Sequence, residues 1–305
     1  AWDRMRIRSI ACRGVISAIT TPFGPDHAVD HAFLARHARW QMENGCDGIV
    51  ALGSLGEAAT LVFDEKVAVL KTLVGALGEK PVVAGIAALS TAEAVALAQA
   101  AKDAGCAGLM VLPPYVYSSD WREMKAHVQA ILRATQLSCM LYNNPIAYRT
   151  DLLAPQIAEL AQEHENLHAV KESSGDVRRV TAVKALCGSR LAVFAGLDDV
   201  VVEAVRMGAV GWIAGLVNAL PRESVGPFDR ASRGERESAD ALYRWFLPLL
   251  RMDTVPKFVQ LIKLVQQEVG MGSERVRAPR LVLAGAEREA ALEVLRAALA
   301  TRPVL

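Results

Sequence analysis

Residues 45–52 read Gly45-Cys46-Asp47-Gly48-Ile49-Val50-Ala51-Leu52, and this stretch decides the fold because its pattern returns twice. It returns as Gly105-Cys106-Ala107-Gly108-Leu109-Met110-Val111-Leu112 and, more loosely, as Gly208-Ala209-Val210-Gly211-Trp212-Ile213-Ala214-Gly215. The first glycine of each copy suits the left-handed residue after a helix, and the apolar run suits a strand covered on both faces. The pattern therefore predicts a repeated helix-to-strand joint in a parallel sheet.

Hydrophobic periodicity extends this pattern along the chain. We expect strands over 14–19, 47–52, 81–87, 107–112, 137–142, 168–172, 191–195 and 210–214. We expect helices between them over 30–44, 64–77, 91–104, 120–135, 155–164, 176–186 and 199–207, several of which begin with Asp or Thr as helix caps do. Eight such units in about 220 residues predict a (β/α)8 barrel, because an open sheet rarely reaches eight regular units.

The chain beyond the eighth expected strand keeps a helical period. It is clearest over 236–250, 254–270 and 287–301, and no linker composition precedes it. We therefore expect a catalytic barrel over residues 10–220 and a C-terminal helical extension over 221–305 that packs on it.

The composition excludes several classes of protein. The 305 residues are 52% hydrophobic and 22% charged, with a net charge of +1, which argues against nucleic acid or anionic membranes as main partners. No stretch reaches the roughly 18 uninterrupted apolar residues of a membrane span, and the basic start lacks the apolar core of a signal peptide. The five cysteines are odd in number and lack C-x-x-C spacing. We therefore expect reduced thiols, no structural metal and a cytoplasmic location.

Lys171 is the first candidate for chemistry, because it closes the apolar run 167–170. A lysine at an arbitrary strand end is usually a solvated surface residue. At the mouth of a barrel, desolvation would instead lower its pKa from ~10.4 toward ~7–8 and make the amine a nucleophile toward carbonyls. In this fold the other carboxyl-terminal strand ends are candidates too. They are 20–22, 53–57, 113–115, 142–145, 196–199 and 213.

Five ordered motifs resemble the dihydrodipicolinate synthase/N-acetylneuraminate lyase family across the whole barrel. They are Thr20-Thr21-Pro22-Phe23, Gly53-Ser54-Leu55-Gly56-Glu57, Pro113-Pro114-Tyr115, Tyr142-Asn143-Asn144-Pro145 and Val170-Lys171-Glu172-Ser173. The resemblance implies a class I lyase in which a lysine on the sixth strand forms a Schiff base with C2 of a 2-oxo acid, without a metal or cofactor. It also implies at least a dimer, and often a tetramer.

Carried over to this sequence, the resemblance gives Lys171 as the Schiff-base lysine and Tyr142 as the residue that moves protons beside it. Ser54 and the backbone N–H groups near Leu55 would hold the substrate carboxylate. The full set of expected substrate-binding residues is Gly53, Leu55, Gly56, Thr20, Tyr115, Asn143, Gly196 and Ile213.

The physical logic of such a site is simple. A protonated imine at C2 is an electron sink, so bonds at C3 and beyond can break through an enamine. We also expect the neighbouring cation to lower the pKa of the Tyr142 phenol, which would then pass protons.

The sequence departs from the lysine-pathway synthase in three places. Leu55 stands where that enzyme carries the second of two threonines, to which we assign a proton relay. Val116 stands at its second relay tyrosine, and Arg149 is displaced from the position of the arginine that binds a semialdehyde carboxylate. On this ground we expect negligible synthase activity.

The motifs are most like the branch that includes Δ1-pyrroline-4-hydroxy-2-carboxylate deaminase, whose reaction releases ammonia and 2-oxoglutarate semialdehyde. The favoured hypothesis is therefore a Schiff-base deaminase that acts on this pyrroline carboxylate or another small 2-oxo acid. The alternatives are 4-hydroxy-tetrahydrodipicolinate synthase, a pyruvate-dependent aldolase, and a non-catalytic 2-oxo-acid-binding relative.

Several other patterns have competing interpretations. His164-Glu165-Asn166-Leu167-His168 matches the zincin H-E-x-x-H, but a helix end at Asn166 would separate the two histidines. Asp198-Asp199 could bind a metal or transfer protons, and we favour Asp199 as the cap of the next helix. Glu57 suits a helix start, residues 173–176 suit a turn and cap, and the aromatic residues 243, 245 and 246 suit a core or subunit interface.

Overall fold

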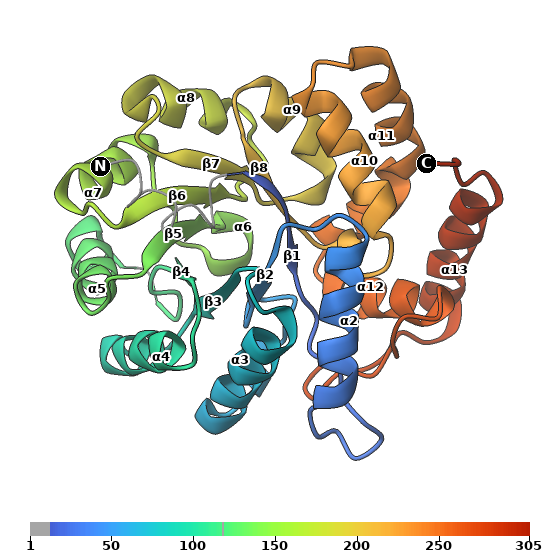
Figure 1. The fold of residues 1–305 in the computed structure, drawn as a ribbon, viewed down its shortest axis with the longest axis horizontal. Helices are drawn as coiled ribbons and strands as arrows, with labels where there is room; N and C mark the ends of the chain where they lie inside the picture. The colour runs from blue at the N-terminus through green and yellow to red at the C-terminus, as the bar shows by residue number, and fades with distance from the viewer. Residues whose placement is uncertain (1–12, 118) are drawn as a thin grey trace.

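The computed structural model describes residues 13–117 and 119–305, and its eight parallel strands close into one barrel in chain order. The strands are β1 Gly14–Ala18, β2 Gly48–Ala51, β3 Val82–Ile86, β4 Gly108–Val111, β5 Ser138–Asn143, β6 Leu167–Glu172, β7 Ala192–Ala195 and β8 Gly211–Ala214. All eight expected strands are confirmed. The helices form a ring outside them, as Figure 1 shows.

Seven of the helices around the barrel follow the expected periodicity. They are α2 His31–Glu43, α3 Phe63–Leu77, α4 Thr91–Asp103, α5 Trp121–Arg133, α7 Ala154–Glu163, α8 Arg178–Cys187 and α9 Val201–Arg206. The sequence analysis missed α6 Pro145–Tyr148 and α10 Pro221–Ser232. Pro227 lies inside α10, and an internal proline normally argues against a helix.

α10 supplies the eighth helix of the barrel, because it follows β8 and packs against β1 and α9. It falls within the range expected for the extension. The division of the chain at residue 220 stays a prediction.

The repeated glycines behave as the sequence predicts. Gly45, Gly105 and Gly208 have φ values of 104°, 92° and 110°, which is the left-handed region that favours glycine after a helix. The second glycine serves packing inside the barrel. A Cβ on Gly211 would lie 2.1 Å from Cε1 of Phe194, whose ring fills the barrel interior.

The C-terminal extension continues with α11 Arg236–Leu250, α12 Phe258–Glu268 and α13 Gly285–Ala300, beside α2 and α10 in Figure 1. The aromatic residues of α11 belong to its packing, as expected for a core. Phe246 is buried, the Tyr243 hydroxyl donates to Glu203 at 2.9 Å, and Trp245 donates to the Ala298 carbonyl at 3.0 Å.

A buried ion pair ties the extension to the barrel mouth. Nζ of Lys263, on α12, lies 2.6 Å from Oε2 of Glu57, and the two side chains are 2% and 0% exposed. The same ammonium donates to the carbonyls of Thr21 and Arg275 at 2.7 and 2.8 Å. Glu57 does begin a short 3-10 helix, η2 Ala58–Thr60, as expected, but its carboxylate is committed to Lys263.

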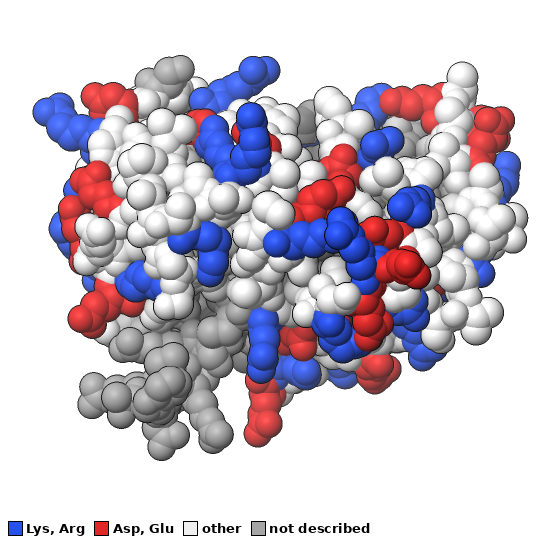
Figure 2. Space-filling view, turned by 90° about the horizontal axis from the view of Figure 1, so that it is seen from above, with Lys and Arg blue, Asp and Glu red and all other residues white. Residues whose placement is uncertain are grey.

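The surface and the thiols agree with a neutral protein that lacks disulfides among its described cysteines. Positive and negative side chains are interspersed over the face shown in Figure 2. Cys46, Cys106, Cys139 and Cys187 carry free thiols, whereas Cys12 lies outside the described residues. No helix in the described part of the chain is long and apolar enough to cross a membrane.

Candidate active site

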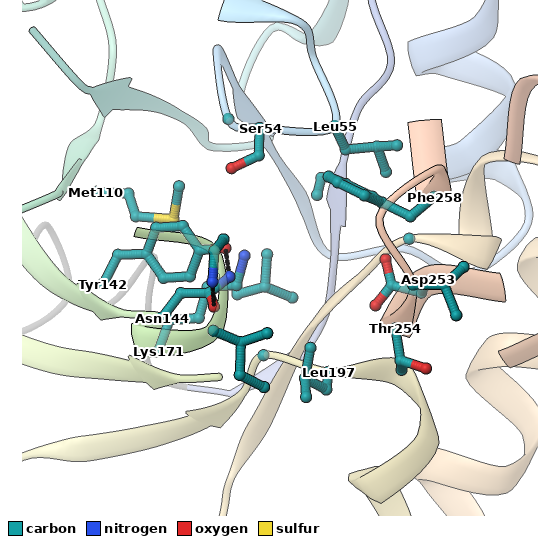
Figure 3. A pocket seen from close by; sticks show the side chains of 18 of the residues that line it. Ser54, Leu55, Met110, Tyr142, Asn144, Lys171, Leu197, Asp253, Thr254 and Phe258 are labelled. Atoms are coloured by element: carbon teal, nitrogen blue, oxygen red, sulfur yellow. Dashed lines mark hydrogen bonds between the residues drawn. The ribbon is translucent and has the colours of Figure 1, made fainter. Parts of the chain in front are cut away.

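A cavity of about 380 Å³ opens at the carboxyl ends of the strands. All three expected catalytic residues line it, Lys171, Tyr142 and Ser54, together with four of the expected binding residues, Gly53, Leu55, Gly196 and Ile213. Figure 3 shows Lys171, Tyr142, Ser54 and Leu55 around a common space. Strand order thus brings together residues that lie more than 150 positions apart in the chain.

Lys171 lies on β6 and is 6% exposed. Burial lowers the pKa of its amine to about 8, and the carboxylates of Asp253 and Asp198 offset part of that effect. Its Nζ lies 4.0 Å from the centre of the Tyr142 ring, a cation–π contact. The amine is therefore neutral in part of the molecules near neutral pH, within the range expected from the sequence.

Tyr142 lies on β5 beside Lys171, and its hydroxyl accepts a hydrogen bond from Nδ2 of Asn144 at 3.0 Å. Burial raises the pKa of this phenol, and hydrogen bonds from Asn144 and Ser54 lower it in part. The expectation that a protonated imine on Lys171 lowers this pKa stays a prediction. The Lys171 amine lies over the ring face, and burial has the largest effect on the pKa of the phenol.

Ser54 connects Tyr142 to a second tyrosine that the sequence analysis overlooked. The Ser54 hydroxyl is hydrogen-bonded to the hydroxyl of Tyr148, at the end of α6. The Tyr148 ring packs edge-on against Tyr142, with 6.0 Å between centroids and an angle of 80°. Three hydroxyl groups, those of Tyr142, Ser54 and Tyr148, therefore form a row inside one chain.

This row corrects the argument drawn from Leu55. Figure 3 shows the Leu55 side chain turned toward Phe258, whereas the Ser54 hydroxyl points toward Tyr142. Ser54, and not Leu55, therefore places its side chain beside the two tyrosines. Val116, at the position of the second relay tyrosine, lies outside this cavity of its own chain and is 63% exposed.

A local signal could have identified Tyr148. Asn144 caps the short helix by accepting the backbone N–H of Ala147 at 3.0 Å, and Pro145 occupies its first position. An Asn-Pro pair right after a strand therefore predicts one helical turn. That turn returns the residue at position 148 toward the strand end.

Four expected binding residues lie outside the cavity. Thr20 and Asn143 are buried in structural contacts: the Thr20 hydroxyl donates to Gln266 of α12 at 2.8 Å, and the Asn143 amide donates to Asp151 at 3.1 Å. Thr20 and Asn143 therefore hold the loops around the site and do not face the Lys171 cavity.

Gly56 and Tyr115 lie outside the Lys171 cavity for different reasons. The Gly56 carbonyl accepts the Thr21 hydroxyl at 2.7 Å, which fixes the loop after β2. Tyr115 lines a separate cavity and packs against Tyr148, with 5.2 Å between ring centroids. Arg149 also lies outside the Lys171 cavity, as an exposed residue that ends α6.

The extension contributes a wall of the cavity that the sequence analysis did not anticipate. Its residues there are Asp253, Thr254, Val255, Pro256 and Phe258. Helical periodicity placed Thr254 in the first turn of a helix, but α12 begins only at Phe258. The preceding segment, η5 Arg251–Thr254, turns Asp253 toward the barrel mouth.

The zincin-like pattern is separated by the fold. His164 ends α7, whereas His168 lies on β6, so they do not share a helix face. Among the described residues, no group of three or more His, Cys, Asp or Glu side chains could hold a metal ion.

The two remaining acidic motifs have structural contacts. Asp199 does not cap a helix as expected. It lies inside a 3-10 turn, η3 Asp198–Val200, that continues into α9, while buried Asp198 accepts the backbone N–H of Leu216 at 2.8 Å. Asp176 forms the expected turn, because it accepts the backbone N–H of Arg178 at 3.1 Å, but the cap residue of α8 is Val177.

The sequence profile of the dihydrodipicolinate synthetase family matches residues 11–298. The chain belongs to this family. A relative from Pelobacter propionicus named 4-hydroxy-tetrahydrodipicolinate synthase is 31% identical over 285 residues, which cover 93% of this chain and 98% of the relative. Enzymes of this family are lyases that join a lysine to pyruvate as a Schiff base and use no metal or cofactor.

Solved structures of family members superimpose on nearly the whole chain. Dihydrodipicolinate synthase from Aquifex aeolicus has a TM-score of 0.90 at 26% identity and covers 93% of this chain and 97% of its own. A monomeric dihydrodipicolinate synthase variant also has a TM-score of 0.90, at 25% identity, and covers 98% of this chain and 99% of its own. The barrel and the family resemblance expected from the motifs are both confirmed.

Proposed function

We propose that the protein is a class I lyase in which Lys171 forms an imine with C2 of a small 2-oxo acid, with pyruvate as the simplest substrate. The observation that carries this proposal is the buried amine itself. Its pKa of about 8 leaves it partly neutral, and it stands over Tyr142 in a cavity at the active face of the barrel.

The loop after β2 supports binding of the substrate carboxylate. No described residue accepts a hydrogen bond from the backbone N–H of Leu55 or Gly56. Leu55 and Ser54 line the cavity that holds Lys171. Adjacent N–H groups in a turn form a suitable cradle for an anion, and a carboxylate there would leave C2 directed toward the amine.

The row of hydroxyls supports the proton transfers that follow. The iminium group makes a proton at C3 acidic, and Tyr142 lies beside the amine, with 4.0 Å between Nζ and the ring centre. Ser54 and Tyr148 extend that hydroxyl into a chain that can supply or remove a proton without a large movement. An enamine formed in this way can attack an aldehyde or eliminate a leaving group.

Two candidates remain for the second half of the reaction. The relatives carry the name 4-hydroxy-tetrahydrodipicolinate synthase, and the row through Ser54 removes the objection based on Leu55. Elimination from Δ1-pyrroline-4-hydroxy-2-carboxylate is favoured by a different observation. Among the described residues that line the cavity there is no arginine, and the one carboxylate, Asp253, would repel a second substrate carboxylate.

Reduction with borohydride in the presence of pyruvate tests the imine directly. We expect intact mass to show one pyruvate-derived adduct, which peptide mapping places on Lys171. A protein that only binds 2-oxo acids would form no adduct, and an adduct on another lysine would contradict the assignment. Assays with aspartate semialdehyde and with the hydroxypyrroline, read as dihydrodipicolinate precursor and as ammonia, then separate the two candidates.

We also propose that the protein is cytoplasmic and forms at least a dimer, as the family resemblance implies. The monomeric variant among the structural neighbours shows that this fold exists without partners, so sedimentation velocity is the direct measurement.

A further inference from the structure

Asp253 reaches the cavity from outside the barrel strands. It lies on η5, which packs against η3, and its Oδ2 accepts the backbone N–H of Asp198 at 3.1 Å. Close packing fixes its position, because a Cβ on Gly215 would lie 2.6 Å from Oδ1 of Asp253. Figure 3 shows the carboxyl group on the side of the cavity opposite Tyr142 and Lys171.

The charge of Asp253 is unusual for its surroundings. Among the described residues that line the cavity, it is the one acidic group and Lys171 is the one basic group, and the remaining lining is mainly apolar. Its neighbour Asp198 differs, because that carboxylate accepts hydrogen bonds from Trp212 Nε1 at 3.0 Å and from the backbone N–H of Leu216 at 2.8 Å. Asp198 is thus occupied by the protein, whereas Asp253 faces the space where substrate would lie.

A carboxyl group held at the wall of a mainly apolar cavity is costly unless something pairs with it. Lys171 interacts with Asp253 electrostatically across the cavity but makes no hydrogen bond to it. Burial raises the pKa of Asp253, and the nearby Lys171 ammonium opposes that rise. Oδ2 of Asp253 accepts the Asp198 N–H, so a substrate that carries a hydrogen-bond donor would provide a partner for the other oxygen, Oδ1, once its C2 is joined to Lys171.

We propose that Asp253 selects the second half of the substrate. Its carboxylate accepts a hydrogen bond from a hydroxyl or protonated amine carried beyond C3, and it repels a carboxylate placed there. The inference rests on the proposed imine at Lys171. It assigns a substrate-binding role to the C-terminal extension, which closes the barrel mouth as well as packing on its side.

Two 2-oxo acids of equal size test this selection without any mutation. 4-Hydroxy-2-oxobutanoate ends in a hydroxyl, and 2-oxopentanoate ends in a methyl at the same position. The extent of Lys171 modification under borohydride is measured against ligand concentration for each acid. The hydroxyl compound should reach half-saturation at a concentration at least about tenfold lower than the methyl compound, as a hydrogen bond to a charged group provides. Equal half-saturation would overturn the proposal.

The Asp253→Asn variant then assigns the preference to one residue. We expect the preference for hydroxyl over methyl to shrink to within about threefold, as a neutral hydrogen bond gives. Modification by 2-oxoglutarate should become more efficient, because its second carboxylate no longer faces a negative charge at position 253. Pyruvate lacks any group beyond C3, so its adduct is the reference to which the other acids are compared within each variant, and its formation also shows that the variant is folded.

Asp199→Asn is the matched control, because it removes the same charge from a half-buried aspartate that is next to Asp198, the residue Asp253 contacts, and that does not line the cavity. It should keep the full preference for the hydroxyl compound. A preference retained in Asp253→Asn, or lost equally in Asp199→Asn, refutes the role of Asp253. Absence of a pyruvate adduct in the unaltered protein would instead refute the proposed function on which the inference rests.

Discussion

Replacing Tyr148 by Phe removes one hydroxyl from the row beside Lys171 and little else. The Phe ring keeps the packing against Tyr142 and Tyr115, whose ring centroids lie 6.0 and 5.2 Å from that of Tyr148. Among the described residues, the Tyr148 side chain is hydrogen-bonded to Ser54 alone, so loss of stability should stay within about 1.5 kcal/mol.

The size of the kinetic effect separates two roles for this hydroxyl. If it only orients Ser54, loss of a neutral hydrogen bond worth about 0.5–1.5 kcal/mol slows the reaction roughly two- to tenfold. If it carries the proton, removal of an acid–base group costs about 10²–10⁴. We expect the larger effect, because the phenol stands at the end of the row and can exchange its proton with the neighbouring space.

Proton NMR in D2O measures this step directly. Pyruvate bound as an imine should exchange its C3 protons for deuterium, and the exchange rate should fall at least about a hundredfold in Tyr148→Phe. Borohydride trapping of pyruvate should remain nearly unchanged, since the amine is intact. Tyr117→Phe, at an exposed tyrosine outside the cavity, is the control. A fall of less than tenfold in Tyr148→Phe would refute the relay.

Three further results are expected. Lys171→Ala should abolish the pyruvate adduct while the unfolding transition is retained; more than a few per cent of the original turnover would exclude Lys171 from the mechanism. The trapping rate should rise about tenfold per pH unit below pH 8 and level off above it, because the neutral amine attacks and burial has lowered its pKa to about 8; a rate still rising steeply at pH 10 would point to a solvated lysine. Glu57→Gln should lower the free energy of unfolding by about 3–5 kcal/mol in urea denaturation, because it leaves the Lys263 ammonium buried without its carboxylate. Glu287→Gln, in the exposed pair with Lys257, should change it by less than about 1 kcal/mol.

The sequence by itself determined the barrel and the centre of its site. Glycines such as Gly45 and Gly105, followed by apolar runs, specify where helices stop and buried strands begin, and this information is local in the chain. Parallel strands then place their carboxyl ends on one face, so Lys171, Tyr142 and Ser54 meet in a single cavity as expected.

Only the tertiary structure decided which loop residues face that cavity. Leu55 and Ser54 are neighbours in sequence, yet the turn after β2 sends one side chain toward Phe258 and the other toward Tyr142. Thr20 lies at a strand end like the others but is bound to Gln266 of α12. The direction of a loop side chain depends on backbone turns and distant partners, which hydrophobic periodicity does not encode.

The role of the C-terminal extension was likewise invisible in the sequence. Asp253 lies 82 positions after Lys171, between the two expected helices 236–250 and 254–270, where the periodicity indicates no contact with the barrel mouth. Its place opposite the amine follows from the packing of η5 on η3 and from the space left by Gly215. Such contacts depend on how whole elements dock, because burial is shared among residues that are far apart in the chain.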